Sequence, residues 1–91
     1  MPLSDAEARE ELRYAVRRYL AARPTAALTL DMITHGLRAK GVGADQDSIF
    51  EQLTYWAELP LPQIKTVRPE HGSTKAFQIT SAGVLADERG E

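Results

Sequence analysis

The sequence predicts a small α+β domain built from three helices, a β-hairpin and a short closing helix. Apolar residues recur every three or four positions through the first two thirds of the chain, which is the period of amphipathic helices. The period then shortens to two on either side of a turn-rich segment, which indicates two paired strands. We expect helices over about 5–23, 30–40 and 46–59, a hairpin over about 64–79, and a helix over about 81–88.

Length and composition limit the classes of function. Ninety-one residues with 43% hydrophobic and 26% charged residues are typical of one globular domain. A formal net charge of -2 gives no overall positive field toward nucleic acid or an anionic membrane. The absence of cysteine excludes disulfides, thiolate chemistry and Cys-based zinc sites. The acidic N-terminal segment and the lack of a long apolar run predict no signal peptide, no membrane partner and a cytoplasmic location.

The first helix begins with an S-x-x-E capping box formed by Ser4 and Glu7, and it ends before Pro24. Its apolar residues predict one buried stripe: Ala8, Leu12, Ala15, Val16, Tyr19 and Leu20. Four arginines flank this stripe: Arg9, Arg13, Arg17 and Arg18. Glutamates lie three or four positions away, so we expect a solvated, salt-bridged face here in preference to a binding stripe.

Side-chain caps also mark the next two helices. Thr29 is the predicted N-cap of the second helix, and Gly41 follows its end. Residues 25–28 before it fit either a short strand or a turn. Asp45 is the predicted N-cap of the third helix, and Pro60 and Pro62 are expected to end this helix.

A helical wheel divides the third helix into two faces. The buried face has Ile49, Leu53, Trp56 and Ala57, with Phe50 at its edge. The outward face has Asp47, Ser48, Glu51, Thr54, Tyr55 and Glu58. Trp56 is therefore expected in the core, in preference to a platform on which single-stranded nucleic acid would stack.

The hairpin is predicted from two β-prone runs, Ile64 to Arg68 and Lys75 to Ile79, around the turn-rich "PEHGST". The second run alternates apolar and polar residues more cleanly than the first. Thr80 is the expected N-cap of the closing helix, which ends in an acidic tail.

This order of elements resembles the winged helix-turn-helix family. Two local patterns support the resemblance, "LTLDMITHGLRAKGVGADQDSIFEQLTYW" and the "FQITSAG" that follows the hairpin. The resemblance implies a small DNA-binding transcriptional regulator, with the third helix in the major groove and the hairpin, or wing, against phosphate or the minor groove. Carried over by position, the expected DNA contacts are Arg38 and Lys40 at the turn before the third helix, Ser48, Gln52 and Tyr55 facing bases, and Lys65, Arg68, His71 and Lys75 on the wing.

The charge of the third helix departs from this pattern, because its outward face has three acids and no Lys or Arg. An exposed carboxylate about 8 Å from a phosphate is repelled by roughly 0.5–2 kcal/mol, less in salt. Non-specific DNA binding is itself only about 5–8 kcal/mol. The alternative hypothesis is a protein-interaction module that binds a basic partner or a second copy. Its expected contacts are Asp47, Glu51 and Glu58, with Tyr14 of the first helix as a dimer contact.

No enzyme chemistry is expected. Asp31 and His35 are spaced i, i+4 and could share a metal, but without a third ligand motif they are better explained as polar helix surface. "GVGAD" matches neither a P-loop nor a dinucleotide fingerprint. We therefore expect no catalytic residue, metal, cofactor or small-molecule ligand.

Overall fold

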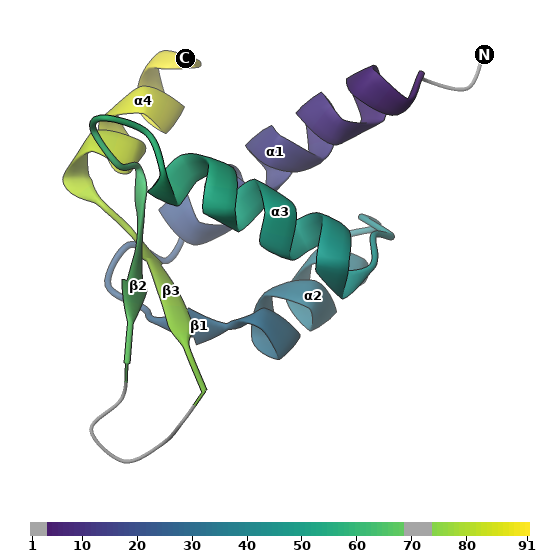
Figure 1. Ribbon diagram of the computed structural model, residues 1–91, viewed down its shortest axis with the longest axis horizontal. Coiled ribbons are helices and arrows are strands. Elements are labelled where there is room, and N and C mark those ends of the chain that lie inside the picture. The colour runs from purple at the N-terminus through teal and green to yellow at the C-terminus, as the bar shows by residue number, and fades with distance from the viewer. Residues whose placement is uncertain (1–3, 69–73) are drawn as a thin grey trace.

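The computed structural model describes residues 4–68 and 74–91, and these residues form an α+β fold (Figure 1). Within them lie four helices and one three-stranded antiparallel sheet. The helices are α1 (Asp5–Ala21), α2 (Leu30–Ala39), α3 (Gln46–Ala57) and α4 (Ser81–Arg89). The strands are β1 (Leu28–Thr29), β2 (Ile64–Val67) and β3 (Ala76–Ile79). The predicted α+β class and the order of its elements are confirmed.

All four predicted N-caps are confirmed, and each accepts a hydrogen bond from the backbone N–H three residues later; they are Ser4, Thr29, Asp45 and Thr80. These bonds satisfy N–H groups that have no partner within the helix. Two helices end earlier than predicted, at Ala21 and Ala57 instead of about residues 23 and 59. The prolines mark only the outer limit of each helix, because the last turn ends before it reaches them.

The sheet has the strand order β1-β3-β2, so β3 is the central strand. Residues 25–28, which fit either a strand or a turn by sequence, lead into β1, in which Leu28 pairs with Phe77. On the other edge Ile64 pairs with Ile79, which confirms the hairpin. The tip of the hairpin lies outside the described residues.

Helices α1, α2 and α3 enclose the core with the sheet closing one side (Figure 1). Among the core residues, Val16, Leu20, Ile33, Ile49, Leu53 and Ile64 are completely inaccessible to solvent. Trp56 is only 4% exposed, and its Nε1–H donates to the Arg13 carbonyl oxygen at 2.9 Å, so its predicted core position is confirmed.

The predicted apolar stripe of α1 is only partly buried. Leu12, Val16 and Leu20 lie in the core, but Ala8 is exposed. The N-terminal turns of α1 extend away from the rest of the molecule, so this end of the stripe stays exposed to solvent (Figure 1). None of the helices in the described part of the chain is long and apolar enough to cross a bilayer.

Candidate functional site

The outward side of α3 is a continuous surface of acids and aromatic rings. Asp47, Glu51 and Glu58 are exposed, as the wheel predicted. Between them Phe50 and Tyr55 keep 45% and 41% of their surface in contact with solvent. We call this surface the acidic face, defined as Asp47, Phe50, Glu51, Thr54, Tyr55 and Glu58. Together with Arg13 and Gln52, these residues line one shallow hollow.

Among the described residues, Arg13 of α1 is the only cation that lines this hollow. Its Nε–H donates to Gln52 Oε1 at 2.9 Å, and its Cζ atom lies 3.9 Å from the centre of the Tyr55 ring. The guanidinium is therefore held by a hydrogen bond and a cation–π contact at the rim of the acidic face. Arg13 orients Tyr55 and offsets part of the negative charge of the face.

The prediction that Gln52 faces outward toward DNA bases is wrong. Its side chain is 1% exposed and is directed to α1, where it accepts the Arg13 hydrogen bond. The physical reason is that α1 covers this side of α3, so a buried amide there needs a partner and Arg13 supplies it. Gln52 is therefore part of the α1–α3 interface.

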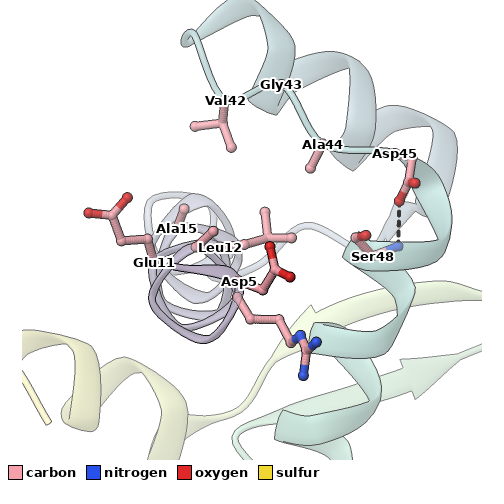
Figure 2. A pocket seen from close by; sticks show the side chains of 11 residues that line it. Asp5, Glu11, Leu12, Ala15, Val42, Gly43, Ala44, Asp45 and Ser48 are labelled. Atoms are coloured by element: carbon pink, nitrogen blue, oxygen red, sulfur yellow. Dashed lines mark hydrogen bonds between the residues drawn. The ribbon is translucent and has the colours of Figure 1, made fainter. Parts of the chain in front are cut away.

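Ser48 also lies off the acidic face, contrary to the wheel. It is half-buried and lines a hollow between α1 and the loop before α3 (Figure 2). Its backbone N–H donates to the Asp45 carboxylate at 2.8 Å. Hydrogen bonds from the Ser48 hydroxyl and from this N–H lower the pKa of Asp45, because they stabilise its ionised form. Asp45 therefore acts as the N-cap of α3 and is not part of the acidic face.

Of the two expected cations of the second-helix turn, Lys40 lies away from the acidic face. Arg38 and Lys40 are both exposed, and Lys40 lines a hollow between α1 and α2 together with Arg18 and Ala22. Ala22 follows Arg13 by nine residues, which at about 100° per residue places the two on opposite sides of α1. The hollow with Lys40 therefore lies across α1 from the acidic face.

The hairpin places Lys65 away from the acidic face as well. Lys65 pairs with Gln78 across the β2–β3 ladder, so the two share one face of the sheet. The opposite face holds Phe77, whose ring lies 6.3 Å from that of Phe50 on α3. Lys65 therefore lies on the side of the sheet away from α3.

Two further hairpin cations flank the strands, and both are exposed. Arg68 follows β2, and Lys75 precedes β3. Lys75 lines a hollow with Phe50 and Asp31 and so reaches the edge of the acidic face. His71 lies outside the described residues. Of the predicted wing contacts in the described part, Lys75 alone lines a hollow together with a residue of the acidic face.

The prediction that Arg17 lies on a solvated face of the first helix is wrong. It is 2% exposed; its Nη1 donates to Gln63 Oε1 at 2.9 Å and its Nε lies 3.5 Å from Asp87 Oδ1. Its Cζ atom also lies 4.7 Å from the centre of the Trp56 ring. Arg17 therefore joins α1 to α3, to the loop before β2 and to α4. The sequence signal for this burial is the spacing: Arg17 precedes Leu20 of the apolar stripe by three residues, so the two side chains lie on the same side of the helix.

The other predicted candidates remain on the surface. Tyr14 is 38% exposed, and its ring meets that of Trp56 edge to face at 5.7 Å. Asp31 accepts a hydrogen bond from the Gln46 amide, and His35 is exposed. Within residues 4–68 and 74–91, no three His, Asp or Glu side chains come together in a way that could hold a metal ion.

Comparisons with known proteins do not assign the chain to a family. No family model matches it, and neither curated proteins nor solved structures include a significant match. We therefore infer its function from the geometry of the described residues.

Proposed function

We propose that the protein is a small protein-interaction module of the winged-helix type, and that its acidic face binds a positively charged segment of a partner protein. The order of helices followed by a hairpin supports the winged-helix assignment. The observation that carries the function is the acidic face itself, where Asp47, Glu51 and Glu58 surround two exposed aromatic rings.

The residue types of this face fit a protein partner. Aromatic side chains with a charged rim are the usual composition of a binding surface between proteins, because rings bury large areas at low cost in conformational entropy. Phe50 and Tyr55 provide the rings, and the carboxylates provide attraction for Lys or Arg at the rim. A partner segment with basic residues beside an apolar side chain matches both features.

The distribution of cations argues against α3 as a DNA reader. Binding in the major groove would bring Asp47, Glu51 and Glu58 near phosphates, at roughly 0.5–2 kcal/mol of repulsion for each. Cations on the same surface would have to compensate. Lys40 lies across α1, however, Lys65 is on the far side of the sheet, and Lys75 reaches only the edge of the acidic face. Arg13 is already engaged with Gln52 and Tyr55.

An NMR titration of the ¹⁵N-labelled protein tests the proposal. The probe is a short peptide of lysine and leucine. The control is the same peptide with every lysine replaced by glutamate. We expect the basic peptide to shift the amide signals of Asp47, Glu51 and Tyr55, and the acidic peptide to leave them unchanged. Glu51→Lys combined with Glu58→Lys should weaken binding about tenfold or more, since each reversal turns an attraction into a repulsion.

Glu88→Lys on α4 is the matched control, because it changes the charge of an exposed helical glutamate outside the acidic face. It should bind the basic peptide nearly as well as the natural protein. If the basic peptide shifts no signal of α3, while duplex DNA at low salt does, the proposal is wrong.

A second candidate function is DNA binding through the hairpin. The observation that favours it is that Lys65, Arg68 and Lys75 are all exposed on or beside the strands. In this case the wing would contact phosphates, while α3 would stay outside the groove. Anisotropy of a labelled duplex at low salt tests it: binding should fall with added salt and be lost in Lys65→Ala combined with Arg68→Ala. No binding to any duplex at low salt would exclude it.

A further inference from the structure

A second surface lies along α1, on the side away from the acidic face. One hollow lies between the N-terminal half of α1 and the loop 42–45 (Figure 2). Another lies between the C-terminal half of α1 and the end of α2. Both hollows are lined by Ala15 and Val42, so they adjoin along α1, and we call the two together the α1 groove.

Small residues in regular spacing line the α1 side of the groove. Ala8, Ala15 and Ala22 follow one another at intervals of seven, which is close to two helical turns, so they form a line along α1. Ala8 and Ala22 are exposed, and Ala15 is half-buried. Two helices pack at a separation that depends on the side chains between them, so this line allows another helix to approach closely.

The two ends of the α1 groove have opposite charge. Three acids and one arginine line the N-terminal end, namely Asp5, Glu11, Asp45 and Arg9. Of the described residues, three cations and no acid line the C-terminal end, namely Arg18, Arg23 and Lys40. Glu11 and Arg18 lie beside the alanine line and are themselves seven residues apart. Both are exposed, and neither has an ion-pair partner within residues 4–68 and 74–91.

We propose that the α1 groove binds a second copy of this chain, with the two α1 helices antiparallel and crossing at Ala15. The antiparallel arrangement places the acidic end of each groove against the basic end of the other. Glu11 of each copy then faces Arg18 of the other, which gives two equivalent ion pairs about a two-fold axis. A parallel arrangement would instead place like charges together, so charge complementarity selects the antiparallel pair.

The shape of α1 supports this occupant. Its first turns extend beyond the body of the molecule, which leaves them free to reach along the C-terminal half of a second α1 (Figure 1). This surface differs from the dimer contact that the sequence predicts at Tyr14. Tyr14 packs toward Trp56, whereas the alanine line borders Val42. The pairing leaves the acidic face of each copy open, so a dimer would present two such faces. A partner that carries two basic segments could then bind both faces and gain avidity.

Sedimentation velocity over a range of protein concentrations tests the pairing, with charge reversals that leave the core unchanged. The natural protein should sediment as a dimer at high concentration. Glu11→Arg should be monomeric, because the introduced guanidinium would face Arg18 of the second copy. Arg18→Glu should be monomeric for the corresponding reason. An equimolar mixture of these two variants should regain the dimer, since both ion pairs are then attractive.

The double variant Glu11→Arg with Arg18→Glu should also form a dimer, because both pairs are reversed together. Glu88→Arg is the matched control and should associate as the natural protein does. Far-ultraviolet circular dichroism of each variant confirms that it remains folded. A natural protein that is monomeric up to roughly millimolar concentration overturns the proposal, as does a dimer that persists in Glu11→Arg. The result is independent of the proposed function, which concerns peptide binding on α3.

Discussion

The Nε atom of Arg17 lies 3.5 Å from the Asp87 carboxylate, and this ion pair between a buried cation and a half-buried acid joins the closing helix α4 to α1. The Arg17 guanidinium is enclosed by Trp56 and bonded to Gln63, so the cation has left water almost completely. A buried charge is tolerated only when its partners remain in place. The pair therefore makes the position of α4 depend on a residue near the middle of α1.

Removing one partner of this pair should cost more than replacing the cation with an apolar chain. Asp87→Ala leaves the Arg17 cation buried without its counter-charge, and we expect a loss of about 1–3 kcal/mol in the free energy of unfolding. Arg17→Met keeps the packing against Trp56 without a buried charge and should cost less. Urea unfolding followed by Trp56 fluorescence measures both. Equal losses in the two variants would show that leaving the buried charge unpaired carries no additional cost.

Gly83 of α4 is required because the chain passes close to it. A Cβ atom at this position would lie 2.2 Å from the Gln63 carbonyl oxygen and 2.6 Å from Ile79 Cγ1. Backbone cannot move aside as a side chain does, so Gly83→Ala should destabilise the protein by about 1–3 kcal/mol. Gly43→Ala is the matched control, because a Cβ there meets no atom of the described residues within 4 Å. It should be neutral or slightly stabilising in thermal unfolding.

The lowered pKa of Asp45 predicts how the stability of the protein depends on pH. Hydrogen bonds from Ser48 lower its pKa in the folded protein below the usual range of an aspartate. Its contribution is therefore fully present above the unfolded pKa and is lost as the pH falls through the lower folded pKa. Asp45→Asn keeps a capping oxygen that does not titrate. The difference in unfolding free energy between the natural protein and Asp45→Asn should stay constant near neutral pH and shift against the natural protein in acid.

Arg13 should reduce the affinity of the acidic face for a cationic peptide, because its own charge lies at the rim of that face. Arg13→Met keeps an unbranched chain over Tyr55 and removes the charge. We expect it to bind the lysine–leucine peptide a few times more tightly, since a rim charge pair is worth about 0.2–1 kcal/mol. The same variant should be less stable, because Gln52 loses its hydrogen bond. Peptide titration and urea unfolding separate the two effects; unchanged affinity would mean that the peptide binds elsewhere.

The elements of this fold could be predicted because their signals are local. Ser4, Thr29, Asp45 and Thr80 each bond within their own first turn, so the sequence shows where each helix begins. The three- and four-residue period likewise identifies Trp56 as a core residue, and the exposed acids of α3 as an outward face.

The errors concern residues whose surroundings come from distant parts of the chain. Gln52 and Arg17 are polar, and their burial depends on partners 39 and 46 residues away, Arg13 and Gln63. A helical wheel contains no information about such partners. The separation of Lys40 and Lys65 from α3 is likewise a property of how α1 and the sheet pack.

The sequence by itself determined the class of the fold, the starts of the helices and the acidic character of the third helix, because each follows from neighbouring residues and their spacing. Only the tertiary structure decided which polar side chains are buried, which cations lie near the acidic face, and that the alanine line of α1 borders an open groove. The reason is physical: burial and charge proximity depend on which elements meet, and packing brings together residues that are far apart in the chain.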